Sequence, residues 1–332
     1  MLSKVNTWKS GTTEGTDKAR RTRCLLRVVM CFMVTVLVNP GLVYAQSGGD
    51  SGSFLRLGIG IRALSMGGAF TSLADDAGAV YWNPAGMGML HATRRQGSLM
   101  YRSMSLDRRQ VAIAYTQHLS ENGGGVGFAL IHLGVDNIDG RNINGQRTGS
   151  LSASENAILL SFSPDIHARI SVGLTMKLLV YRLAGQSAKG FGGDIGFIAR
   201  PIDPLSVGFI FRDVGTRITW DTAGLFSRNV QRSETLPRSF TIGASYRFWQ
   251  ERMTVAVDIE SAQRRDSEVH IGAEFNLPGQ FAARTGLRGG QFTAGTGFVT
   301  SYRSTSVRLN YVFLNDRIGA GDTHAIEWEV GF

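Results

Sequence analysis

Cysteine is almost absent from this chain of 332 residues. Its two cysteines, Cys24 and Cys31, both lie within residues 1–45, a stretch that we expect to be removed on export. A chain that loses both has no thiol for a disulfide, a thiolate metal site or a cysteine nucleophile. The sequence therefore excludes thiol chemistry from the mature protein.

Long apolar runs are also missing. The chain is 43% hydrophobic, yet no run reaches the ~18 apolar residues that a membrane helix needs, and the mean hydropathy is -0.03. Proline is scarce, with 7 residues, whereas glycine reaches 42. This composition favours many strands over packed helices.

Motifs for catalysis and cofactor binding are missing as well. The chain has no G-x-S-x-G, no H-E-x-x-H and no P-loop, and its six histidines are scattered without ligand spacing. Gly58-x-Gly60-x-x-Ala63 resembles a dinucleotide fingerprint but lacks the strand–helix–strand context that such a site needs. We therefore expect no enzyme, no cofactor and no metal.

Residues 1–45 have the pattern of an export signal. A basic stretch precedes the apolar run 28–38, and Ala45 provides a small residue at the cut. Removal of this segment leaves 28 Lys and Arg against 24 Asp and Glu, so the formal net charge falls from +9 to +4. The basic character thus lies largely in the signal, and we expect no nucleic-acid partner.

The next segment, 46–93, combines a flexible leader with a region that we interpret as a plug. Its stretch 57–89 is too rich in Gly and Ala for a core helix and lacks the period of a membrane strand. Pro84 disfavours helical geometry at Asn83, so the chain must bend there.

After about residue 94 the hydrophobic period becomes two. Apolar residues from Ile170 to Val180 alternate with small or polar ones, in segments long enough to cross a bilayer as tilted strands. The expected strands are 94–103, 109–118, 124–133, 153–163, 167–182, 190–200, 204–212, 237–248, 252–260, 267–277, 280–288, 291–300, 304–313 and 323–332. We predict an all-β fold, a transmembrane barrel of about fourteen antiparallel strands over 94–332, with the N-terminal plug inside it. Alternation alone would also permit a soluble β-sandwich.

Connections and the C-terminus favour the barrel. Turns at 164–166, 201–203, 250–251 and 278–279 are short, whereas 134–152 and 213–236 are long. Short periplasmic turns that alternate with longer outer loops are typical of bacterial barrels. The last segment alternates to Phe332, which resembles the signal read by the outer-membrane assembly machinery. We expect the outer membrane of a Gram-negative-type bacterium, with membrane lipid around the barrel.

If the apolar set faces lipid, charged residues of the other set face the lumen. Their signs alternate along neighbouring strands, which stabilises cross-strand pairs. They can form a structural ion-pair lattice or a charged pathway for a solute, and the two are compatible. The lumen charges are Arg247, Asp258, Glu260, Glu274, Arg284, Arg288, Arg308 and Glu327. We further expect Asp75 or Asp76 to pair with a lumenal arginine and hold the plug.

The stretch from Arg62 to Met87 resembles a known family. Its order R-A-L-x-M-G-G-A-F, A-D-D-A, Y-W-N-P-A-G-M is similar to the start of the PorV/PorQ proteins, which resemble the FadL-type outer-membrane channels. The resemblance implies a FadL-like barrel with the Asn-Pro-Ala element in an internal hatch, where it either gates or only forms a tight turn. The plug residues that it singles out are Arg62, Gly67, Gly68, Asp75, Asp76, Asn83, Pro84 and Ala85.

The resemblance implies two functions. A FadL-like channel passes hydrophobic or amphipathic solutes, and the apolar residues of the plug could either bind such a ligand or simply pack against the wall. A PorV-like component of type IX secretion binds cargo or translocon proteins, and its long loops would carry partner contacts. Aromatic residues dominate interface hot spots, and the candidate contacts in loop 213–236 are Trp220, Leu225 and Phe226, which could instead fold inward as a lid.

Overall fold

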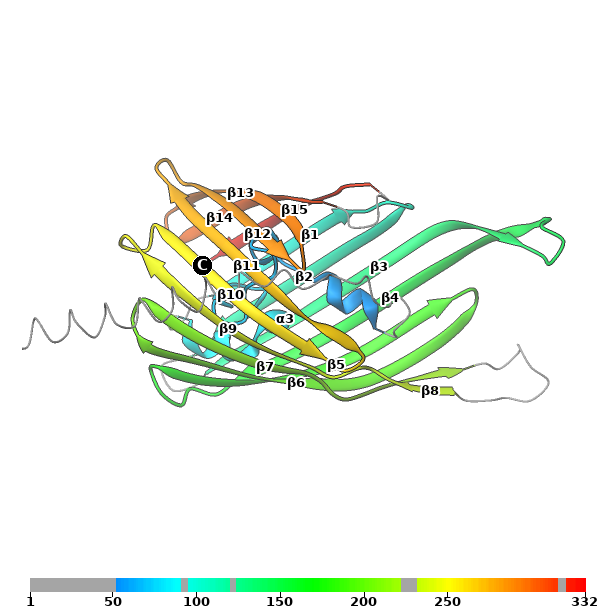
Figure 1. Cartoon of the computed structure of the whole chain (residues 1–332), viewed down its shortest axis with the longest axis horizontal. Helices are drawn as coiled ribbons and strands as arrows, with labels where there is room; N and C mark the ends of the chain where they lie inside the picture. The colour runs from blue at the N-terminus through cyan, green and yellow to red at the C-terminus, as the bar shows by residue number, and fades with distance from the viewer. Residues whose placement is uncertain (1–51, 91–94, 120–123, 222–231, 316–320) are drawn as a thin grey trace, which may run out of the picture. The chain divides into compact units, whose positions relative to one another are not determined.

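Fourteen antiparallel strands close into a barrel in the computed structural model, which describes residues 52–90, 95–119, 124–221, 232–315 and 321–332 (Figure 1). The first strand, β1, pairs with both β2 and the last strand, β15, and every strand between pairs with its neighbours. A short additional strand, β8, pairs only with β7. The predicted all-β barrel of about fourteen strands is confirmed, and its ring is β1–β7 followed by β9–β15.

The predicted segments correspond to the observed strands. Their bounds are β1 Arg95–Ser103, β2 Arg108–His118, β3 Gly125–Arg141, β4 Arg147–Ser163, β5 Ile170–Leu183, β6 Gln186–Ile202, β7 Leu205–Asp221, β8 Arg232–Thr235, β9 Ser239–Phe248, β10 Met253–Ala262, β11 Arg265–Leu277, β12 Phe281–Arg288, β13 Gln291–Tyr302, β14 Thr305–Leu314 and β15 Thr323–Gly331.

The two long loops are shorter than the sequence predicts. Strands β3 and β4 continue through most of 134–152 as a hairpin that projects beyond the other strands at one end of the barrel (Figure 1). Likewise, β7 extends to Asp221, and β8 occupies 232–235. We call this end the long-loop end. The opposite end, which carries the turns 164–169 and 278–280, is the short-turn end.

Side chains alternate between an apolar outer face and a polar inner face. In β5, Leu174, Met176 and Leu178 are exposed, whereas Thr175 and Lys177 between them are buried. Because a closed barrel leaves no unpaired edge, this outward apolar surface suits a lipid environment.

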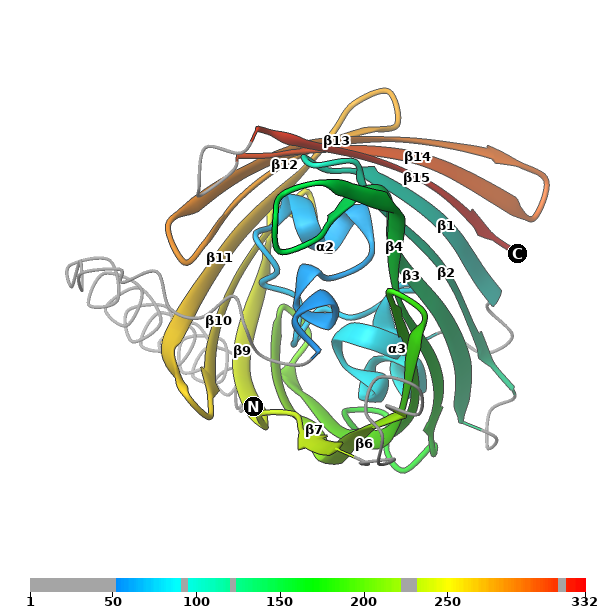
Figure 2. The same ribbon diagram turned by 90° about the vertical axis from the view of Figure 1, so that its right-hand side faces the viewer.

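The N-terminal segment lies inside the ring of strands (Figure 2). It consists of η1 Ser53–Leu57, α2 Ile61–Ser65, α3 Ala79–Trp82 and η2 Pro84–Met89. We call residues 52–90 the plug. No helix in the described part of the chain is long and apolar enough to span a bilayer.

The plug and barrel form one compact unit, Gln46–Phe332, whereas Met1–Ala45 separates as another. The predicted export signal and most of the leader lie outside the described residues. The export signal therefore stays a prediction.

Apolar residues of the plug form the core. Ile59, Ile61, Met66, Phe70 and Leu73 are all 2% exposed or less. Burial of side chains of this size stabilises docking by about 1.5–3 kcal/mol each. Of the two roles open to them, packing is the one that this burial favours.

Candidate functional site

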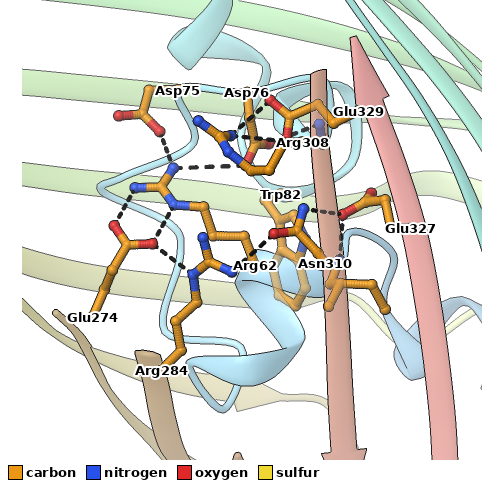
Figure 3. A network of polar contacts seen from close by, with 12 residues as sticks. Arg62, Asp75, Asp76, Trp82, Glu274, Arg284, Arg308, Asn310, Glu327 and Glu329 are labelled. Carbon is orange, nitrogen blue, oxygen red and sulfur yellow. Dashed lines mark hydrogen bonds and ion pairs between the residues drawn. The ribbon is translucent and has the colours of Figure 1, made fainter. Parts of the chain in front are cut away.

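Arg62 is the centre of a buried polar network between the plug and the wall (Figure 3). Its Nε and Nη2 donate to the two carboxylate oxygens of Glu274 on β11, at 2.8 and 2.9 Å. Its Nη1 donates to Asp75 at 2.5 Å and lies 3.7 Å from Asp76. A guanidinium suits this arrangement because its planar donors match a carboxylate at two points.

The network continues along the wall. Arg284 Nε donates to the same carboxylate of Glu274 at 2.7 Å, and its Nη1 donates to Asn310 at 3.0 Å. Asn310 in turn donates to Glu327 at 3.3 Å, whereas Arg308 pairs with Glu329 at 2.8 Å. Arg284–Glu274 and Arg308–Glu329 are therefore cross-strand ion pairs between neighbouring strands of the wall.

Two wall carboxylates bind plug backbone rather than an arginine. Asp258 on β10 accepts the N–H groups of Phe70 and Thr71 at 3.0 and 2.9 Å. Glu327 on β15 accepts the N–H of Ile61 at 2.9 Å. These carboxylates thus satisfy plug amides that no regular secondary structure would pair.

Asp75 connects the network to a second wall arginine. Its Oδ2 accepts from Arg247 Nη2 at 3.2 Å, the kind of contact expected from the sequence. Burial raises the pKa of Asp75, but Arg62 and Arg247 outweigh it and hold this pKa below its usual value. That the contact holds the plug in place stays a prediction.

Asp76 lies in a different electrostatic environment. Its Oδ1 accepts the N–H of Gly78 at 2.8 Å, and Arg62 is its nearest cation. Burial, and then the negative charge of Glu329, raise the pKa of Asp76 to about 7. Two adjacent carboxylates of the plug therefore titrate in different ranges.

The Asn-Pro-Ala element attaches the plug to β6 and β7. The Asn83 amide nitrogen lies 2.8 Å from the carbonyl of Thr71 and 3.2 and 3.3 Å from those of Phe197 and Phe209. Its Oδ1 accepts from Ala85 N, and Pro84 begins η2. This geometry favours the tight-turn role, because all these groups are engaged, and gating stays untested.

Gly67 and Gly68 let the plug approach the wall closely. Both have positive φ, 66° and 80°, and a Cβ on Gly67 would lie 2.6 Å from the carbonyl oxygen of Leu287. His270 Nδ1 also meets the Gly67 carbonyl at 2.9 Å. Backbone conformation therefore favours glycine at both positions, and lack of space requires it at Gly67.

Two chambers lie on opposite sides of the plug. The short-turn chamber, of about 300 Å³, is bordered by Arg62, Asp75 and Asp76 and by strands at the short-turn end. The long-loop chamber, of about 50 Å³, is bordered by Tyr81 and Trp82. It also contains Arg212, whose guanidinium lies 4.9 Å from the Tyr81 ring centroid.

The other predicted residues are dispersed. Glu260 pairs with Arg265 at 3.2 Å, and Arg288 donates to the carbonyl of Arg56 at 2.8 Å; both border the long-loop chamber. Trp220 belongs to β7 rather than to a loop and packs on Tyr181, with ring centroids 6.3 Å apart. Leu225 and Phe226 lie outside the described residues.

Three polar residues of the site escaped the sequence analysis: Asn310, Gln96 and Thr116. All are fully or almost fully buried on the inner face. The alternating pattern of β1, in which Gln96 shares a face with Met100 and Arg102, would have indicated the position of Gln96. The inner-face residues were predicted from alternating charges, and neutral polar residues add nothing to that pattern.

Comparison with solved structures shows the same fold. The toluene transporter TodX of Pseudomonas putida matches with a TM-score of 0.59 and 15% identity, over 82% of this chain and 97% of that chain. The toluene transporter TbuX of Ralstonia pickettii matches with a TM-score of 0.56 and 13% identity, over 82% and 97%. A FadL homologue of Pseudomonas aeruginosa matches with a TM-score of 0.53 and 10% identity, over 82% and 96%.

Sequence comparison adds no closer relationship. No protein-family model matches the chain, and no curated protein matches it. The PorV/PorQ resemblance is not shown. The comparisons show the FadL-like fold, a closed 14-stranded barrel whose N-terminal segment precedes the strands.

Proposed function

We propose that this chain is an outer-membrane channel that passes small hydrophobic or amphipathic solutes past its plug. One observation carries the proposal. The plug lies between two chambers, and its contacts with the wall include ion pairs and hydrogen bonds around Arg62, Asp258 and Asn83 beside the apolar core. Water that enters from the chambers can bind these polar groups when the plug moves, which offsets part of the cost of breaking their contacts.

The fold supports the same proposal. TodX and TbuX are described as toluene transporters, and a barrel with an apolar outer face suits a membrane. The outward apolar surface and the FadL-like fold together favour the outer membrane as the location.

A reversible lock on the plug tests this proposal directly. Ser206 Oγ on β7 donates to the carbonyl of Ser72 in the plug at 2.8 Å, so the two residues adjoin. The predicted mature chain has no cysteine, and Ser72→Cys with Ser206→Cys would introduce a single pair. Oxidation would tie the plug to the wall, and a reductant would free it.

The readout is uptake of radiolabelled octanoate and toluene by a bacterial host that lacks its own FadL-like channel. We expect uptake above that of the empty host with the reduced pair, and loss of that gain on oxidation. Uptake equal to that of the empty host, with folded barrel in its outer membrane, would overturn the channel. Uptake that oxidation leaves unchanged, with the disulfide verified, would overturn passage past the plug.

A secretion role is the second candidate, and one observation favours it. Beyond Val135 and Ala153 the β3–β4 hairpin leaves both its neighbours and projects from the barrel, with Ile143 fully exposed near its tip. Such an arm offers two free strand edges to a protein partner.

Affinity purification in mild detergent from native membranes, with and without residues 138–149, would test the secretion role. A stoichiometric secretion protein that depends on the arm would favour this role, and its absence would count against it.

A further inference from the structure

In the part of the chain that the structure describes, the short-turn chamber contains one carboxylate, that of Asp76, without a close cationic partner. It is lined by three arginines, Arg62, Arg284 and Arg308, and by four carboxylates. Each arginine already pairs with a carboxylate, at Glu274 or Glu329, and Asp75 pairs with Arg62 and with Arg247, which lies outside the lining. Among these carboxylates, Asp76 has the weakest cationic partner, at 3.7 Å from Arg62.

A second feature of the chamber is independent of charge. Gln96 on β1 lines it and is 1% exposed, yet neither its amide oxygen nor its amide nitrogen has a hydrogen-bond partner among the described residues. Thr116, which faces Gln96 in the β1–β2 register, also has an unpartnered hydroxyl within the described ranges. An unsatisfied buried polar group costs about 1–3 kcal/mol, so these groups favour a polar occupant.

The two features adjoin. Ser98, two residues after Gln96, is the register partner of Glu329 on β15, so Gln96 and Glu329 project inward from neighbouring strands. Figure 3 places Asp76 beside Glu329 and Arg308, and all four residues line the same chamber. A carboxylate pair and a free carboxamide therefore face one volume of about 300 Å³.

We propose that the short-turn chamber binds a small polar amine, whose ammonium group lies between Asp76 and Glu329 and whose neutral hydroxyl or amide groups bind Gln96. An ammonium supplies a closer cation for Asp76 than Arg62, at 3.7 Å, and up to three donors for carboxylate oxygens. A hydroxyl both donates and accepts, and this matches the nitrogen and oxygen of Gln96. The volume is at the small end for ligand pockets, which limits the occupant to a compact solute.

This inference rests on the proposed channel only for the route by which the amine arrives. Binding itself needs no passage, and the two can fail separately. An apolar solute would match only the apolar part of the lining, at Leu277, Phe281 and Val299, and would leave the carboxylates and Gln96 without partners.

The test is calorimetric titration of the folded full barrel in detergent. The probe is D-glucosamine, and its control is D-glucose, which has a hydroxyl in place of the ammonium. We expect glucosamine to bind at least about tenfold more tightly than glucose. No detectable glucosamine binding, or equal binding of the two sugars, would overturn the inference.

Variants locate the site. Asp76→Asn and Gln96→Leu should each weaken glucosamine binding by about fivefold or more, whereas Gln110→Leu should leave it unchanged. Gln110 is an equally buried glutamine on β2 that binds the carbonyl of Gly58 and lies outside the chamber. Heat-modifiable gel migration shows whether each variant is folded. Full affinity in folded Asp76→Asn or Gln96→Leu would overturn the assignment.

Failure of the channel would be recognised separately. A barrel that binds glucosamine through Asp76 and Gln96 but passes no solute would retain this site and lose the proposed function. A barrel that takes up octanoate but shows no amine preference would retain the channel and lose this site.

Discussion

Arg62 in the plug and Glu274 on β11 form a two-point ion pair, with N–O distances of 2.8 and 2.9 Å across 212 residues of sequence. Side-chain exposure is 13% for Arg62 and 5% for Glu274. A buried pair of this kind adds little compared with an apolar replacement of both partners, but removal of one partner leaves an uncompensated charge. The pair therefore fixes where the plug sits and makes its displacement sensitive to either residue.

Arg62→Met should loosen the plug. The change keeps the apolar stem but leaves Glu274 with Arg284 alone and Asp75 with Arg247 alone. Because each carboxylate keeps one arginine, the cost should be smaller than the penalty of about 3–5 kcal/mol for an uncompensated buried charge. We expect faster amide hydrogen exchange over residues 58–76, with strands β4–β6 unchanged.

The control for this variant is Arg109→Met. Arg109 pairs with Asp136 at 3.0 Å, but both side chains are more than half exposed, and such pairs contribute about 0–1 kcal/mol. Wild-type exchange in Arg62→Met, or an equal effect of Arg109→Met, would contradict the role of the buried pair.

Removal of both plug carboxylates should also expose the plug. Asp75→Asn with Asp76→Asn deletes the contact with Arg247 and leaves Arg62 with Glu274 as its acidic partner. We expect faster cleavage of the N-terminal segment by a protease added at the short-turn face. Unchanged cleavage, in a barrel whose heat-modifiable migration is normal, would show that the carboxylates do not hold the plug.

The strand pattern was readable from the sequence because one face of each strand meets an apolar environment. Residues 170–180 alternate in the chain and in the burial of β5 alike. The β3–β4 arm was missed for the same reason, since most of its residues beyond Val135 are exposed on both faces and show no alternation. A solvated hairpin has no hydrophobic period to detect.

The site was only partly predictable. Lumenal carboxylates could be placed on the inner face, but their partners depend on the depth and rotation of the plug. Asp258 binds the amides of Phe70 and Thr71. Every residue except proline has a backbone N–H, so the sequence does not show which of them a carboxylate binds. Glu274 and Arg284, on neighbouring strands, could be paired from their register alone.

Plug docking should weaken as pH rises through neutrality. Burial, followed by the charge of Glu329, raises the pKa of Asp76 to about 7, above the ordinary value of about 4 for aspartate. The docked plug therefore binds this proton more tightly than the free plug. Protonation of Asp76 therefore stabilises docking fully below about pH 4, and this stabilisation is lost as pH rises through about 7.

Planar-bilayer recordings can measure this dependence. Openings should be more frequent at about pH 8 than at about pH 5. In Asp76→Asn, which cannot ionise at this position, the frequency should vary much less with pH. Equal frequencies at both pH values in the wild type, or an undiminished dependence in Asp76→Asn, would contradict the role of Asp76.

Asn83→Asp should detach the Asn-Pro-Ala turn from β6 and β7. The substitution keeps the shape and the acceptor for Ala85 N, but it places a carboxylate oxygen against the carbonyls of Thr71, Phe197 and Phe209. A buried charge without its donors costs several kcal/mol, so we expect a lower midpoint for heat-induced unfolding on gels and greater solute leakage in liposomes.

The matched control is Asn156→Asp, because Asn156 also donates to a strand carbonyl, that of Val180, but outside the plug. If the turn only positions the plug, Asn83→Ala should show a smaller loss of the same kind. If it gates, leakage should rise in Asn83→Ala without any change in the unfolding midpoint.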